Sequence, residues 1–296
     1  MHFADAKGIL TNNHGFCGMN IYRGCTHGCV YCDSRSECYQ FTHPFEDVEV
    51  KRNAPDLLRR TLKSKRKKCM IGTGSMSDPY MHCEKDLKLT RQCLEIIHEY
   101  GFGVSLLTKS DLVLRDTDIL EKINDRAKCV VQMTLTTYDD DLCSILEPHV
   151  CNTKRRIEVL KEMNRRGIPT MVWLTPILPF INDTRKNIEP ILCACVEAKV
   201  KGIVTYGMGM TLREGDREYF YDALDRHFPG VKDRYIRKFG YAYELMSPNN
   251  KELMTYLRKV CRDNGIMSSW EDCFRYLNEF PDKNNQISIF DLNNEL

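Results

Sequence analysis

Residues 18–32 read GMNIYRGCTHGCVYC, so an apolar run of strand length leads directly into three closely spaced cysteines. The run predicts a strand over Met19–Arg23. Gly24 and Gly28 permit the tight turns of a metal-binding loop, because glycine tolerates backbone angles that other residues avoid. Three thiols this close together in a polar loop predict a metal site, and its residues are Cys25, Cys29 and Cys32.

Downstream of this loop, short apolar runs alternate with longer amphipathic segments as far as about residue 210. Such alternation predicts an α/β fold with a parallel sheet, and the spacing suits a TIM-type barrel or a doubly wound sheet equally well. Further strands are expected over Cys69–Gly74, Gly103–Thr108, Cys129–Leu135, Thr170–Thr175 and Gly202–Gly207. Helices are expected over Ala54–Arg66, Leu89–Tyr100, Asp116–Asp125, Lys154–Arg166 and Thr184–Lys199.

The same pattern divides the chain into four segments. An N-terminal segment, residues 1–16, precedes the alternating core of residues 17–210. Residues 211–280 are richer in charged and aromatic side chains, and no linker-like stretch precedes them, so we expect a C-terminal extension that caps the core. Residues 281–296 are polar apart from one apolar patch and are expected to form a mobile tail.

The charge balance is nearly neutral. The chain has 43 Lys plus Arg against 41 Asp plus Glu, a formal charge of +2, which gives no global reason to expect binding to nucleic acid or to an acidic membrane. Any such binding must be local. The first residues lack a signal-peptide pattern, and no run of about eighteen apolar residues occurs. We therefore expect a soluble, cytoplasmic protein with no membrane partner.

Fifteen cysteines are spread along the chain, which is far longer than a small disulfide-stapled domain. In a reducing compartment most of them are expected to be free thiols. Those in apolar runs are expected to be small buried hydrophobes, namely Cys69, Cys129, Cys193 and Cys195. The spacings of Cys193, Cys195, Cys261 and Cys273 match no cluster pattern, so no second cluster is predicted.

Zinc and an iron–sulfur cluster are the alternatives for the cysteine loop. Structural zinc sites close four ligands, and the fourth would be His27, Cys17, Cys38 or a distant residue. Three cysteines instead leave one iron of a [4Fe-4S] cluster without a protein ligand. Because chemistry in α/β folds collects at the C-terminal ends of parallel strands, a loop after the first strand is a suitable place for such a cofactor.

Residues 25–32, CTHGCVYC, resemble the CxxxCxxC signature of the radical S-adenosylmethionine (SAM) superfamily, with the aromatic Tyr31 before the last cysteine. Three later segments resemble the branch that contains spore photoproduct lyase and related predicted DNA-repair proteins. They are GTGSMSDPY at 72–80, LTKSDLVLRD at 107–116 and TPILPFIND at 175–183. The resemblance covers about residues 17–210.

This resemblance implies a partial TIM-type (β/α)6 barrel that carries a [4Fe-4S] cluster on the three cysteines of the loop. It also implies that SAM binds the open iron and is cleaved to methionine and a 5′-deoxyadenosyl radical, which abstracts a hydrogen atom from substrate. The electron would come from an external one-electron donor such as flavodoxin or ferredoxin. The protein's part is to hold the reactants in register and to exclude water.

The resemblance also places the SAM contacts. Strand ends are expected to approach the methionyl group closely, and a lysine after the third strand is expected to lie near the SAM carboxylate. Polar groups after the fourth strand would hold the ribose and a carboxylate, with Arg155 or its neighbour Arg156. The expected contacts are Tyr31, Gly72, Thr73, Gly74, Ser75, Asp78, Thr108, Lys109, Thr134 and Arg155.

One departure bears on the substrate. In spore photoproduct lyase a cysteine implicated in hydrogen return precedes the loop that corresponds to Ser75–Asp78, and an approximate alignment places Ser75 at its position. A hydroxyl O–H bond is too strong to donate hydrogen readily to a carbon radical. The thymine-dimer reaction is therefore not carried over, unless Cys83 or another thiol takes that role.

Three functions stay open: radical chemistry on a DNA lesion or modified base, the same chemistry on a peptide or small molecule, and a non-catalytic iron–sulfur protein. The basic run Lys63–Lys68, KSKRKK, precedes the second strand and is expected to be a surface turn on the face opposite the cluster. The tyrosines of the extension are expected to pack in the capping layer rather than to contact substrate or relay a radical; they include Tyr235, Tyr241 and Tyr243.

The tail carries a short motif around Gln286, Ile289 and Phe290. It resembles the QLSLF-type peptides by which bacterial repair and replication proteins dock on the DNA sliding clamp. An extended segment with alternating aliphatic residues and an aromatic one suits a preformed hydrophobic groove. Packing of the same side chains on the chain's own barrel is the alternative.

Overall fold

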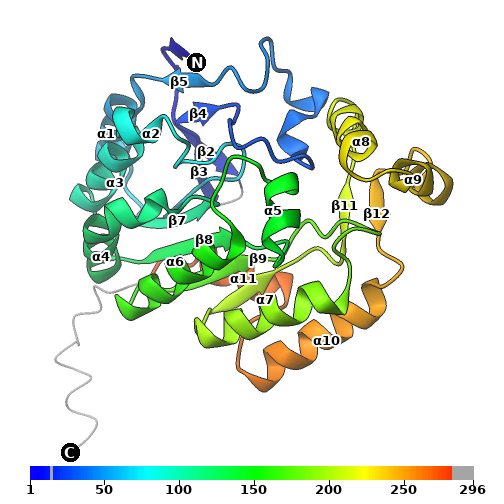
Figure 1. Cartoon of the computed structure of the whole chain (residues 1–296). Coiled ribbons are helices and arrows are strands. Elements are labelled where there is room, and N and C mark those ends of the chain that lie inside the picture. Colours follow the sequence, from blue (N-terminus) through cyan, green and yellow to red (C-terminus); the bar gives the residue numbers. More distant parts are fainter. Residues whose placement is uncertain (14–15, 282–296) are drawn as a thin grey trace, which may run out of the picture.

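The computed structural model describes residues 1–13 and 16–281 (Figure 1). Its main sheet has seven strands in the order β10-β9-β8-β7-β6-β3-β2, of which the first six are parallel and β2 is antiparallel to β3. Both ends of this order are edges, so the sheet is a partial barrel that does not close. The strands are β2 Leu10–Asn13, β3 Phe16–Met19, β6 Met70–Thr73, β7 Gly103–Thr108, β8 Cys129–Thr134, β9 Thr170–Trp173 and β10 Gly202–Val204.

Helices cover the outer face of this sheet, as the alternating pattern predicts (Figure 1). Each packs an apolar stripe against the strands, and one large core lies between the two layers. The α/β fold is confirmed, and most expected elements are confirmed to within one to three residues at each end. The helices are α1 Ala54–Ser64, α3 Leu89–Glu99, α4 Thr117–Arg126, α6 Thr153–Arg165 and α7 Arg185–Glu197.

The prediction of a single strand over Met19–Arg23 is wrong. The sheet strand β3 ends at Met19, and Tyr22–Arg23 form a separate strand, β4, in a small sheet of order β1-β5-β4. The apolar run contributes to two sheets, because the buried Met19 lies in β3 of the main sheet and the buried Tyr22 lies in β4 of the small sheet. The partners of β4 in that sheet are β1 His2–Ala4 and β5 Glu49–Lys51.

The C-terminal part of the chain both caps and fills the barrel. Strands β11 and β12 form an antiparallel ribbon with α8 and α9 beside it, and α10 packs against α7 (Figure 1). Helix α11 contacts β10 and β6, and it places Cys273 and Leu277 among strand residues. The new elements are β11 Gly209–Thr211, α8 Asp216–His227, α9 Val231–Phe239, β12 Glu244–Met246, α10 Asn250–Asp263 and α11 Trp270–Asn278.

Helix α11 packs against several strands at once. Its Cys273 packs with Met70, Val130, Met171 and Val204, which come from four different strands of the sheet. The absence of a side chain at Gly202 leaves space for the helix. A Cβ at Gly202 would lie 3.1 Å from the Cys273 Sγ and 2.6 Å from the Met171 Cε.

The basic run Lys63–Lys68 ends α1 and leads into β6, at the N-terminal end of the parallel strands as predicted. Within the described ranges, no helix combines the length and the apolar character needed to cross a membrane.

Candidate active site

The cysteine loop follows β4 and depends on two glycines. Gly24 has a φ of +90°, and a Cβ there would lie 2.4 Å from the Phe45 carbonyl oxygen. That same oxygen accepts the Cys25 N–H at 3.1 Å. Gly28 has a φ of +71°, and a Cβ there would lie 2.9 Å from the His149 ring. Both positions therefore require glycine, as the sequence predicts.

The three thiols of this loop line one cavity of about 650 Å³ at the C-terminal ends of the strands. All three are free, Cys25 and Cys29 are buried, and Cys32 is partly buried. Burial raises the pKa of Cys25 to about 12 and also raises the pKa of Cys29 and of Cys32. The loop therefore favours thiolates only when a metal centre supplies positive charge.

The spacing of these thiols suits a cluster better than a single zinc ion. Among the described residues, three potential metal ligands come within 4.8 Å of one another only at a separate site that involves no cysteine. A tetrahedral zinc site, with Zn–S bonds of about 2.3 Å, needs sulfur atoms only about 3.8 Å apart. A cluster that carries each thiolate on a different iron tolerates a wider spacing. The donor set of the loop thus fits a [4Fe-4S] cluster.

The cavity also gathers most of the expected SAM contacts. It is lined by the loops that follow β6, β7, β9 and β10, by the last residue of β8 and by the β11–β12 ribbon. Seven of the ten expected residues line it: Tyr31, Gly74, Ser75, Asp78, Thr108, Lys109 and Thr134.

Asp78 holds these loops together. Its Oδ1 accepts hydrogen bonds from the Thr108 hydroxyl at 2.7 Å and the Tyr80 N–H at 2.8 Å. Its Oδ2 accepts the Lys109 N–H at 2.7 Å and lies 3.5 Å from the Nδ1 of His27. Burial lowers the pKa of His27 to about 4, so this imidazole is neutral at physiological pH. One carboxylate thus ties the ends of β6 and β7 to the cysteine loop.

Lys109 is the cation at the end of β7. Its Nζ lies 5.9 Å from the centre of the Tyr31 ring and makes no ion pair within the described part of the chain. The ammonium group lines the same cavity as the three thiols. It is therefore available to an anionic ligand group beside the cysteine loop.

Three expected contacts do not line the cavity. Gly72 and Thr73 lie within β6, before the loop that reaches the site. Arg155 points to the outer surface, where its Nε contacts an Oδ2 of Asp111 at 2.9 Å and its Nη1 contacts Glu158 at 2.7 Å. Neighbouring helix residues point about 100° apart, so Arg155 faces outward while the next residue faces inward.

Arg156 is that inward residue and is fully buried. It donates through Nη1 to the Thr134 carbonyl oxygen at 3.0 Å and pairs with Glu147 at 2.5 Å. Glu147 in turn accepts a hydrogen bond from the Tyr31 hydroxyl. Burial raises the pKa of Glu147, and the guanidinium opposes that shift. The sequence contains the signal for Arg156, since it is in helical phase with the buried Val159, Leu160 and Met163.

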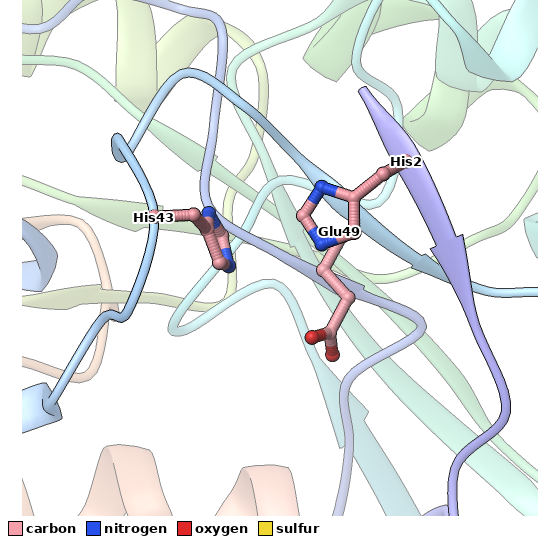
Figure 2. A group of neighbouring side chains, drawn as sticks. All are labelled: His2, His43 and Glu49. Carbon is pink, nitrogen blue, oxygen red and sulfur yellow. The ribbon is translucent and has the colours of Figure 1, made fainter.

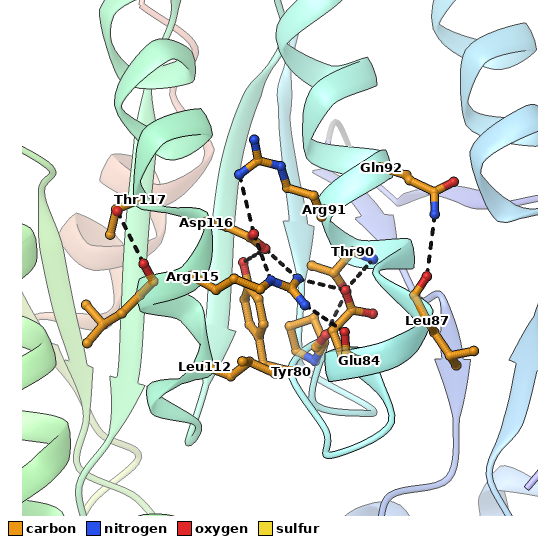
Figure 3. Close-up of polar contacts among 12 residues, drawn as sticks. Tyr80, Glu84, Leu87, Thr90, Arg91, Gln92, Leu112, Arg115, Asp116 and Thr117 are labelled. Atoms are coloured by element: carbon orange, nitrogen blue, oxygen red, sulfur yellow. Dashed lines mark hydrogen bonds and ion pairs between the residues drawn. The ribbon is translucent and has the colours of Figure 1, made fainter.

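A second buried network braces the loop after β6 (Figure 3). The Tyr80 hydroxyl donates to Asp116 at 3.0 Å. Arg115 contacts Asp116 at 2.7 Å and the fully buried Glu84 at 2.9 Å. Gly74 begins this loop with a φ of +101°, and a Cβ there would lie 1.8 Å from the Leu107 carbonyl oxygen. The loop is thus held tightly against the end of β7.

Aromatic side chains form other parts of the cavity wall. The Trp173 Nε1 donates to Gln132 at 2.7 Å, and its ring meets Tyr206 edge-on at 6.2 Å. Arg213 donates to the Tyr243 hydroxyl at 2.7 Å. The expected packing is wrong for two tyrosines of the extension, since Tyr243 lines the cavity and Tyr241 is 94% exposed. Only Tyr235 is buried, with its hydroxyl donating to the Pro179 carbonyl at 2.8 Å.

The remaining sequence candidates lie elsewhere. Cys83 does not line the cavity, and within the described ranges the loop cysteines are the only thiols that do. The expected burial of Cys193 is wrong, since this thiol is exposed, whereas Cys195 and Cys261 are buried in the main core and Cys273 is buried within α11. The clamp-like motif at Gln286, Ile289 and Phe290 lies outside the described residues.

Several known proteins are similar in sequence to this chain. A protein of Methanocaldococcus jannaschii of uncharacterized function is 37% identical over 167 residues, 56% of this chain and 61% of that protein, so the chain spans about three fifths of that relative. The radical SAM Nalpha-GlyT isomerase of Pseudomonas phage M6 is 25% identical over 53% of this chain and 32% of its own.

Among solved structures, spore photoproduct lyase complexed with dinucleoside spore photoproduct matches with a TM-score of 0.65 at 12% identity, over 90% of this chain and 80% of that one. At this identity the match establishes the fold alone. The family model of the radical SAM superfamily matches residues 19–192, which is more than half of the chain. The chain therefore belongs to the radical SAM superfamily of enzymes, whose members use a [4Fe-4S] cluster and SAM.

Proposed function

We propose that Cys25, Cys29 and Cys32 hold the [4Fe-4S] cluster, and that the enzyme abstracts a hydrogen atom from a nucleobase or nucleotide. The observation that carries the proposal is a cavity of about 650 Å³ that brings these thiols together with several aromatic rings and with Lys109, which has no ion-pair partner among the described residues. This volume lies within the usual range of small-molecule sites.

Lys109 is proposed to pair with the SAM carboxylate, because its ammonium faces the cavity beside the cysteine loop. Asp78 keeps the strand ends in place through its hydrogen bonds to Thr108 and to the Lys109 N–H. Gly74 lets the backbone approach a ligand closely, since it carries no side chain at the cavity wall. Tyr31 and Thr134 line the remaining wall at this end.

When bound, the reduced cluster and SAM supply the 5′-deoxyadenosyl radical that abstracts hydrogen, and the electron is proposed to come from a flavodoxin or ferredoxin. Among the chain's own residues, Trp173 lines the cavity and packs edge-on against Phe274 of α11 at 6.0 Å, which holds its ring in place at the wall.

A nucleic-acid substrate is supported by the aromatic and basic groups near this cavity. Trp173, Tyr206 and Tyr243 offer ring faces or edges on which a base extruded from a helix can stack. Helix α9 exposes Arg237 and Lys238 just before the exposed Tyr241, which gives local positive charge despite the nearly neutral chain. The structurally similar lyase is complexed with a dinucleoside, which favours the same class of substrate.

The thymine-dimer reaction itself is not proposed. Ser75 lines the cavity where the sequence comparison expects a hydrogen-returning thiol, and Cys83 lies away from it. Recruitment to a sliding clamp through Gln286, Ile289 and Phe290 remains a proposal, as does a cytoplasmic location. A reducing compartment would keep the fifteen cysteines as thiols. The division into a core of 17–210 and a capping extension of 211–280, followed by a tail, is proposed on the same sequence grounds.

The experiment is deuterium transfer. Enzyme reconstituted with iron and sulfide under anaerobic conditions is reduced with dithionite and given SAM with fully deuterated oligonucleotides that are undamaged, irradiated or carry modified thymine. Deuterium in 5′-deoxyadenosine, measured by mass spectrometry, is the expected result. Cys29→Ser should lose SAM cleavage, whereas Cys38→Ser, an exposed cysteine outside the cavity, should keep it. SAM cleavage without deuterium transfer from any of these oligonucleotides would refute the nucleic-acid substrate.

A further inference from the structure

A second group of potential ligands lies on the small N-terminal sheet, away from the cysteine cavity. His2 of β1 and Glu49 of β5 are register partners in a parallel pair, so both side chains lie on one face of that sheet. His43 comes from the preceding loop, and its ring meets that of His2 edge-on at 4.8 Å (Figure 2). One ligand atom of each residue lies within 4.8 Å of the other two.

Hydrogen bonds assign the same tautomer to both histidines. The Nδ1 of His2 lies 3.0 Å from an Asp47 carboxylate oxygen, and the Nδ1 of His43 lies 3.0 Å from the Pro44 carbonyl oxygen. Both of these oxygens accept hydrogen bonds and a carbonyl oxygen never donates one, so in the neutral rings Nδ1 carries the proton. Each Nε2 therefore presents a lone pair.

One of these lone pairs has no donor in the described part of the chain. The His43 Nε2 is buried from solvent and has no hydrogen-bond partner among the described residues. The Glu49 carboxylate adds further acceptor oxygens, and no ion pair involving it is found in the described part of the chain. Three electron-pair donors thus converge, and among the described residues the buried Nε2 of His43 lacks a proton donor, which a bound cation would replace.

We propose that His2, His43 and Glu49 bind a divalent first-row transition-metal ion of the zinc class. Imidazole ligands select such ions over Mg²⁺ and Ca²⁺, and two histidines with a carboxylate form a known zinc donor set. Asp47 completes the carboxylate–histidine–metal arrangement that orients a ligating ring. A tetrahedral site with bonds of about 2.1 Å has ligand atoms about 3.4 Å apart, so small side-chain rotations draw the ligands inward on binding.

Solvent can reach this site, and the site adjoins the cysteine loop. The side chains of His2 and Asp47 are 41% and 38% exposed, which leaves an entry path for the ion. The loop that carries His43 also carries Phe45, whose carbonyl oxygen accepts the Cys25 N–H. A metal here would tie that loop to β1 and β5, and so would support the backbone that holds Cys25. The inference rests on residues that the proposed reaction does not use.

The test is Zn²⁺ titration by calorimetry on tag-free protein whose cluster has been reconstituted, so that the loop cysteines are occupied. A second preparation carries Ser at Cys25, Cys29 and Cys32. Both should bind one zinc ion per chain at this site. His43→Ala should weaken that binding more than the roughly tenfold to hundredfold expected for Asp47→Asn.

Glu49→Gln, which keeps the shape of the side chain, is the second ligand variant and guards against a folding defect in the first. His227→Ala, at an exposed histidine of α8, is the matched control and should bind as the unaltered protein does. Co²⁺ in place of Zn²⁺ should give visible bands without an intense thiolate charge-transfer band. Equal zinc stoichiometry and affinity in the unaltered protein, His43→Ala and Glu49→Gln would overturn the proposal, as would a thiolate-dominated Co²⁺ spectrum.

Discussion

Replacing Glu147 by Leu tests the buried support of the cysteine loop. The substitution leaves the guanidinium of Arg156 fully buried without its carboxylate partner. It also removes the acceptor of the Tyr31 hydroxyl. Arginine does not lose its proton in proteins, so the uncompensated charge cannot be neutralised in place. Both effects act on the wall that carries the cysteine loop, because Val30 donates to the carbonyl of Leu146 beside this position.

Breaking a buried ion pair by removing one partner typically costs about 3–5 kcal/mol. The entropy of unfolding is about 2.1 cal/mol/K per residue near the transition, which for 296 residues is about 0.6 kcal/mol/K. The expected loss therefore lowers the melting temperature by about 5–8 °C. Replacing both partners, as Glu147→Leu with Arg156→Met, should recover most of that loss because no buried charge remains.

The assay is thermal and urea unfolding of the apoprotein, together with iron bound per chain after reconstitution. Arg155→Ala is the matched control, since this adjacent arginine makes only partly exposed ion pairs worth about 0–1 kcal/mol each. Glu147→Leu should lose both stability and bound iron, while Arg155→Ala should keep both. Equal effects of the two substitutions, or no recovery in the double variant, would refute the reasoning.

Three further predictions concern single positions. Gly74→Ala should abolish SAM binding measured by calorimetry, because its Cβ would lie 1.8 Å from the Leu107 carbonyl oxygen, while Gly8→Ala, with no atom near its Cβ, should bind normally. Lys109→Met should weaken SAM binding roughly tenfold or more through loss of a charge-assisted contact, and an unchanged Kd would contradict its role. Burial raises the pKa of Asp216 to about 6, so its contribution to apoprotein stability is present at low pH and is lost as the pH rises through 6. Asp216→Asn should flatten that slope between pH 4 and 7 in urea unfolding, and an unchanged slope would count against the buried carboxyl.

The sequence predicts the barrel well where hydrophobic periodicity is the dominant force. The strand at Gly103–Thr108 is found at its expected bounds, and the outer helices differ by at most two residues at their ends. The strand expected over Met19–Arg23 fails because its apolar residues divide between two sheets, which no local pattern distinguishes. The filling of the barrel by α11 also escapes prediction, since it joins Cys273 to strands far away in the sequence.

The residues of the site can be predicted from the sequence where they lie at the C-terminal ends of neighbouring parallel strands. The ends of β6, β7 and β8 converge on the cysteine loop, so Gly74, Asp78 and Lys109 meet as expected. Arg155 is the expected contact, although the helical phase favours Arg156. No sequence pattern singles out Glu147, because its role depends on a hydrogen bond from the hydroxyl of Tyr31, which is distant in the sequence.

Electron paramagnetic resonance of the reduced, reconstituted enzyme tests the central claim most directly, namely that Cys25, Cys29 and Cys32 hold a cluster with one iron open to SAM. The protein should bind four irons per chain and show a [4Fe-4S]⁺ signal that changes when SAM is added, and Cys29→Ser should lose that signal. A cluster signal that does not change when SAM is added, or an unchanged signal in the Cys29→Ser variant, would contradict the account.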